Sequence, residues 1–129
     1  MKVYTTNDDK IAMDILMLIR LNSDCARVHW SQSIKNIPSN VKNALVTIEE
    51  YVEQKIPDLC GKERSVLSEE EETIFLSALK NNNTLKETLG TGVILKGKQA
   101  VEVKAIIKSE RTLNKIKEAI ESGEHVIVF

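Results

Sequence analysis

Residues 92–129 read GVILKGKQAVEVKAIIKSERTLNKIKEAIESGEHVIVF, and this stretch decides the predicted fold. The apolar residues 93–95 end at Lys96-Gly97-Lys98, and a glycine between two short runs of β-formers is typical of a hairpin turn. Residues 101–107 then alternate between apolar and polar side chains, which is the period of a strand with one covered face. The pattern therefore predicts two antiparallel strands, over 92–95 and 101–107.

The second half of this stretch predicts a helix and a closing strand. Ser109 stands where a helix N-cap belongs, Glu110 follows in the first turn, and Ile116 and Ile120 mark an apolar face. Gly123 is a typical residue just past a helix end. Residues 126–129 are apolar without alternation, as in a strand covered on both faces. We expect this last strand to be interior and parallel to 101–107, because short strand–helix–strand connections favour a right-handed parallel crossover.

The first part of the chain predicts mainly helices. A short edge strand over 2–5 precedes a helix that is apolar on most of its faces, starting near residue 8, which is typical of a core element. A second helix over 39–55 is expected to end before Pro57, since a proline disfavours helical backbone in the residue before it. Ser68 and Glu71 have the spacing of a capping box, which predicts a third helix over 68–80.

These elements predict an α/β fold of the mixed α+β kind. N-terminal helices pack on a small mixed sheet, and a β-β-α-β unit forms the C-terminal part. The 129 residues are expected to form one domain, with a mostly helical half over 1–60 and an α-β-β-α-β half over 68–129. Trp30, the only tryptophan, is expected in or near the core, with a partner-binding anchor as the alternative.

Composition narrows the function classes. The net charge is −1, so no overall field selects nucleic acid or a membrane, and no membrane partner is expected. The two cysteines form no CxxC motif and the two histidines are isolated, which disfavours a structural zinc site and a disulfide scaffold. The N-terminus lacks the pattern of a secretory signal, so a cytoplasmic location is expected.

Charge is distributed unevenly along the chain. Residues 49–72 hold nine acidic and three basic residues, a net charge of −6. Residues 92–117 hold seven basic and two acidic residues, a net charge of +5. A basic partner surface would be attracted to the first segment, and phosphates to the second.

Glu102 and Lys104 are the candidate catalytic residues, because alternation on the predicted strand 101–107 places both side chains on one face. A carboxylate is a hard oxygen ligand for Mg²⁺ or Mn²⁺, and a neighbouring lysine can orient an attacking water or stabilise charge on a phosphate. The alternative is a solvent-facing pair on the wet face of a half-buried strand. Only the structural environment of Glu102 distinguishes a site from such a pair.

The sequence Val101-Glu102-Val103-Lys104, between a helix over 68–80 and the closing helix and strand, resembles the core of the PD-(D/E)XK nuclease superfamily over residues 68–129. The resemblance implies a metal-dependent nucleic-acid phosphodiesterase with Glu102 as a metal ligand. It also implies a second carboxylate from the preceding helix, for which Glu71 is the candidate, with Glu72, or Glu87 from outside that helix, as alternatives. The family's aspartate, expected just before Gly92, is replaced by Thr91. This departure favours a catalytically degenerate, nucleic-acid-binding relative.

Two classes of function follow, and enzymatic activity is left open between them. In the first, basic residues of the C-terminal part contact phosphates, namely Lys96, Lys98, Lys108, Arg111 and Lys115. In the second, the chain is a non-enzymatic protein-binding module such as an immunity protein, an antitoxin or a phage-encoded inhibitor. Its acidic 49–72 segment would then face a basic toxin or nuclease. A winged helix-turn-helix is a third alternative, in which the last helix and strand are surplus.

Overall fold

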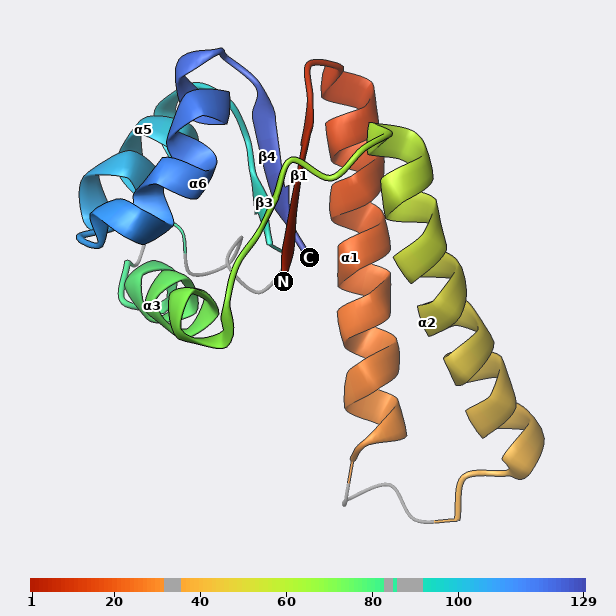
Figure 1. Cartoon of the computed structure of the whole chain (residues 1–129). Helices are drawn as coiled ribbons and strands as arrows, with labels where there is room; N and C mark the ends of the chain where they lie inside the picture. The colour runs from red at the N-terminus through yellow and green to blue at the C-terminus, as the bar shows by residue number, and fades with distance from the viewer. Residues whose placement is uncertain (32–35, 83–84, 86–91) are drawn as a thin grey trace.

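The computed structural model describes residues 1–31, 36–82, 85 and 92–129 and shows a sheet between two helical layers (Figure 1). Helices α1 and α2 cover one face, and α3, α5 and α6 cover the other. The elements in chain order are β1 (Lys2–Thr6), α1 (Asp9–His29), α2 (Ser39–Cys60), β2 (Ser65–Val66), α3 (Glu69–Lys80), β3 (Val93–Ile94), α5 (Lys98–Ile106), α6 (Glu110–Glu121) and β4 (His125–Val128). The predicted α+β class, with N-terminal helices packed on a small sheet, is confirmed.

The four strands have the order β2-β1-β4-β3, and every pairing is antiparallel. The expected mixed sheet is therefore wrong. Strand β4 is interior as predicted, because it pairs with β1 through Tyr4 and Ile127 and with β3 through Ile94 and Val126. Strand β1 is also interior, and not the expected edge strand, because β2 pairs with its other side. The two halves of the chain thus share one sheet.

Strand alternation divides the apolar side chains of the sheet between two cores. Val3, Val126 and Val128 point to one face and pack with residues of α3, α5 and α6. Tyr4 and Ile127 point to the other face. There they pack with side chains that α1 and α2 contribute at helical spacing, namely Ile15, Leu16, Ile19, Val52 and Ile56. Both faces of the sheet are therefore dry, as the unbroken apolar run at the C-terminus indicated.

The predicted strand over 101–107 is wrong, because these residues belong to helix α5 and the turn that follows it. The buried residues are Ala100, Val103 and Ile107, whose spacing of three and four is helical. Val101, which strand alternation would bury together with Val103, is 65% exposed. Two helices, and not one, connect β3 to β4, so the C-terminal unit is β-α-α-β and its strands run antiparallel.

Helix α2 is longer than predicted. It continues through Pro57 to Cys60, and the Gly61 N–H closes its end by donating to the Pro57 carbonyl. Proline lacks the N–H that would bond one turn back, but the apolar positions Val52 and Ile56 are fully buried against the sheet and α1, and this burial holds the helix together.

The caps expected for two other helices are confirmed. Ser68 and Glu71 form the capping box of α3, and Ser109 caps α6. Of the helices that the structure describes, none combines the length and apolarity needed to cross a membrane.

Candidate functional site

The predicted catalytic pair, Glu102 and Lys104, lies on helix α5. Residues two apart on a helix point about 200° from each other, so the two side chains do not share a face. Lys104 Nζ lies 2.8 Å from Glu121 Oε1 on α6. This hydrogen bond and the lysine charge lower the pKa of the Glu121 carboxyl. Lys104 thus joins two helices, and the strand geometry on which the metal-site hypothesis rested is absent from α5.

Glu71, the candidate second carboxylate, is 3% exposed and caps helix α3. Its Oε1 accepts the Ser68 N–H at 3.2 Å and lies 3.7 Å from Lys115 Nζ. Burial acts to raise the pKa of Glu71, but the hydrogen bonds with Ser68 and the charges of Lys115 and Arg111 outweigh it, so the pKa is lowered. No three His, Cys, Asp or Glu side chains among the described residues gather closely enough to hold a metal. Glu87 and Thr91 lie outside the described residues.

The five predicted phosphate-contacting residues do not gather in one place. Lys96 precedes α5 and Lys108 follows it, so a helix of nine residues, about 13 Å long, lies between them. Lys96 pairs with Asp9 of α1. Arg111 and Lys115 lie one turn apart on α6, and both act on Glu71. Lys115 also donates to the Val66 carbonyl at 2.8 Å, while Lys98, at the start of α5, is exposed to solvent.

The acidic segment 49–72 is likewise divided. Its first acids, Glu49, Glu50, Glu53 and Asp58, lie on α2, and its last four lie in the first turn of α3. These helices cover opposite faces of the sheet (Figure 1). A net charge that is continuous in sequence therefore becomes two separate acidic surfaces.

One polar cluster, at the junction of α1, β3 and β4, was not predicted from the sequence. His125 is 5% exposed; its Nδ1 accepts the Lys96 backbone N–H at 3.0 Å, and its Nε2 lies 2.7 Å from Asp9 Oδ1. The hydrogen bonds from Lys96 and His125 lower the pKa of Asp9. Both ring nitrogens of His125 are hydrogen-bonded, so the imidazole links β4 to α1 and to the residue that follows Leu95. It has no free nitrogen to act as a base. Asp9 and His125 are 116 positions apart, so no local motif announces the contact.

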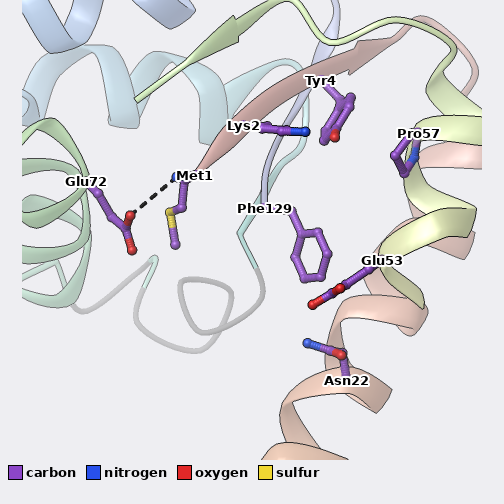
Figure 2. A pocket seen from close by; sticks show the side chains of 8 residues that line it. All are labelled: Met1, Lys2, Tyr4, Asn22, Glu53, Pro57, Glu72 and Phe129. Carbon is purple, nitrogen blue, oxygen red and sulfur yellow. Dashed lines mark hydrogen bonds and ion pairs between the residues drawn. The ribbon is translucent and has the colours of Figure 1, made fainter. Parts of the chain in front are cut away.

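A cavity of about 620 Å³ lies between one end of the sheet and the helices α1 and α2 (Figure 2). Tyr4 faces it from β1, Phe129 from the end of β4, and Asn22 and Glu53 from the helices. Its other lining residues are Met1, Lys2, Pro57 and Glu72. The Met1 amino group bonds Glu72 Oε2 at 3.4 Å, and Lys2 pairs with Glu63 outside the cavity. The cavity therefore has aromatic walls, and several of its charges are already neutralised by neighbours.

The most unusual surface is the end of the α1–α2 hairpin that projects past the sheet (Figure 1). We define this distal arm as residues 22–30 and 39–49. The residues buried against the sheet end at Ile19 on α1 and begin again at Val52 on α2; within the arm, Cys25 is buried and Ile48 packs at the edge of that core. Within the arm, polar atoms are buried without a hydrogen-bond partner: Asn22 Oδ1, His29 Nδ1 and Glu49 Oε1. Four of its large apolar side chains are exposed: Val28, Trp30, Val41 and Val46.

Trp30 has the largest exposed fraction of the exposed apolar residues on the distal arm. The residue is the C-cap of α1 and is 77% exposed, and its ring centroid lies 4.7 Å from that of His29 with the two ring planes tilted by 56°. The expected core position of the tryptophan is therefore wrong, and the alternative of an exposed anchor matches its position.

The chain matches no protein-family model, no curated protein and no solved structure.

Proposed function

We propose that the chain is a non-enzymatic protein-binding module, of the kind represented by immunity proteins, antitoxins and phage-encoded inhibitors. Its binding surface is the distal arm. The observation that carries the proposal is the inverted polarity of the arm, with polar atoms of Asn22 and Glu49 inside and the apolar Trp30 outside. The predicted Glu102–Lys104 pair does not support an enzyme here, because its members diverge on α5.

The energetics of the free arm favour a partner. A buried polar atom without a hydrogen bond costs about 1–3 kcal/mol, and an exposed apolar side chain gains nothing from hydrophobic burial. The exposed apolar side chains of the arm therefore contribute little to the stability of the free chain. A partner that covers Val28, Trp30 and Val41 would recover the lost hydrophobic term. Contiguous apolar patches on a protein surface often mark sites of protein interaction.

The chemistry of the arm also describes the partner. Tryptophan is enriched among residues that dominate binding energy, usually by filling an apolar pocket. We infer a partner protein with a pocket wide enough for the Trp30 indole. Next to the arm, α2 carries the exposed Glu50, so a basic residue is expected near the rim of the pocket. The acids of α3 lie across the sheet and play no part in this contact.

Site-specific photo-crosslinking tests the proposal. A photoreactive amino acid replaces Val28 on the arm, and a matched chain carries it at Val101, which is also exposed but lies on α5. In cells of the organism that encodes the chain, irradiation should give a discrete protein adduct from position 28 only. Adding Trp30→Ala should abolish the adduct while leaving the thermal unfolding curve unchanged. The same adducts from both positions, or none from position 28, would contradict the proposal.

A further inference from the structure

We infer that a second, separate surface of the α1–α2 hairpin binds another copy of this chain. The surface is the outer groove, which we define by its lining residues Asp14, Met17, Leu18, Leu21, Tyr51, Lys55 and Leu59. It lies on the part of the hairpin that packs against the sheet, and it shares no residue with the distal arm. The inference therefore does not rest on the function proposed for the arm.

The groove combines an apolar ridge with an adjacent hollow. Met13, Met17 and Leu21 follow one another at four-residue spacing on α1, with exposed fractions of 48%, 68% and 44%. Tyr51, 54% exposed, stands across the hollow on α2. The hollow has a volume of about 510 Å³. Side chains that form ridges along one helix pack into the grooves beside another, so the surface has the shape of half of a four-helix contact.

Charge decides which occupant matches the groove. Asp14 lines it from α1 and Lys55 from α2, and within the described residues neither has an ion pair. An occupant must therefore present an apolar helical surface with one cation and one anion in the reversed arrangement. A second copy, turned about a two-fold axis parallel to the helices, presents this arrangement. Each α1 then lies over the partner's α2, and Asp14 of each chain meets Lys55 of the other.

The alternative two-fold arrangement is electrostatically worse. With an axis perpendicular to the helices, each α2 would lie on the partner's α2. Helix α2 carries four acidic and two basic residues, so two helices of net charge −2 would face each other. Helix α1 carries three of each sign, so pairing α1 with α2 avoids this repulsion. The charges thus select a single geometry, with Asp14 and Lys55 in contact twice.

Analytical ultracentrifugation with charge-reversal variants tests the inference on the intact chain. The parent should sediment as a species of twice the chain mass of 14.5 kDa, with dissociation on dilution. Asp14→Lys alone, and Lys55→Glu alone, should each weaken dimerisation by about tenfold or more, since like charges then meet twice. Met17→Glu should give a monomer, whereas Trp30→Ala and Val101→Glu should leave the dimer intact.

Mixing the two charge-reversal variants separates a dimer from any other occupant. In a mixed dimer, Lys at position 14 meets Glu at position 55, and Asp14 meets Lys55, so both pairs are restored. Equal amounts of the two variants should therefore recover the parental dimerisation, and so should the double variant in one chain. A parent that is monomeric at all concentrations, or variants that do not recover on mixing, would overturn the inference. Either result leaves the crosslinking test of the distal arm unaffected, so the two failures are distinguishable.

Discussion

The Nε2 atom of His125 lies 2.7 Å from Asp9 Oδ1, within hydrogen-bond distance, which joins the first residue of β4 to the first residue of α1. The Nδ1 atom of the same ring accepts the Lys96 N–H, so Nε2 carries the proton and donates it to the carboxylate. Lys96 Nζ lies 2.9 Å from the same oxygen of Asp9. One carboxylate therefore fastens the start of α1 to the sheet.

Asp9→Asn should lower the stability of the chain at neutral pH. The fold lowers the pKa of Asp9 through Lys96 and His125, so its contribution is present above the ordinary pKa of 3.8 and is lost as the pH falls through the folded value. The stability difference between parent and variant should therefore be largest near pH 7 and shrink below about pH 4. Urea unfolding at both pH values measures it.

The control for this variant is Asp58→Asn, which removes an exposed carboxylate elsewhere on the chain. It should change the stability by less than about 0.5 kcal/mol at either pH. If Asp9→Asn behaves in the same way as the control, the contact between Asp9 and His125 does not contribute to the folded state.

Val101→Ala and Val103→Ala distinguish helix α5 from a strand. Val103 is fully buried, so its truncation should cost about 2 kcal/mol through lost burial and a cavity. Val101 is 65% exposed on a helix, where alanine is the better helix former, so its truncation should be neutral or slightly stabilising. A strand would bury both valines on one face. Equal losses from the two variants in denaturant unfolding would therefore contradict the helix.

Gly92→Ala should destabilise the sheet by more than about 1 kcal/mol. Gly92 has φ +71°, and a Cβ atom there would overlap the carbonyl oxygen of Val128 in the interior strand β4. Gly61→Ala is the matched control, because Gly61 has φ +83° but nothing within 4 Å of the added Cβ. Both variants have the conformational strain, and only Gly92→Ala has the clash. In thermal unfolding, Gly92→Ala should have a clearly lower Tm than Gly61→Ala. Equal Tm values would show that β4 shifts to accommodate the added Cβ atom.

Glu102→Gln should leave the chain unchanged in both stability and metal binding. The side chain lies on α5 with no cluster of metal ligands around it in the described part of the chain, so we expect no saturable Mn²⁺ binding by the parent. The substitution should alter stability by less than about 0.5 kcal/mol. Calorimetric titration with Mn²⁺ checks the first statement. Saturable binding by the parent that is lost in Glu102→Gln would restore Glu102 as a metal ligand.

The sequence predicted the elements whose ends are locally encoded. The capping box of Ser68 and Glu71, the N-cap Ser109 and the unbroken apolar run of β4 each act within a few residues, and each prediction is confirmed. Helix α5 was missed for the opposite reason. It has only nine residues, and the valines at 101 and 103 imitate strand alternation, while its burial is set by contacts with α3 and α6.

The candidate surfaces depended on contacts that sequence spacing does not reveal. The tie between Asp9 and His125 spans 116 positions. The inverted polarity of the distal arm was hidden because residues 24–37 show no clear period, although α1 continues to His29. The lone Trp30 was the one available signal, since an aromatic residue beyond the last core position of a helix has no core to enter.

The fluorine resonance of Trp30 tests the central claim, that the distal arm binds a protein. Because Trp30 is the only tryptophan, labelling with 5-fluorotryptophan gives a single ¹⁹F signal, located on the arm. We predict a narrow line at the position of an exposed indole in buffer. In concentrated extract of the source organism, the line should shift or broaden, and excess unlabelled parent, but not unlabelled Trp30→Ala, should reverse the change. A line that stays as narrow and unshifted in extract as in buffer would contradict the account.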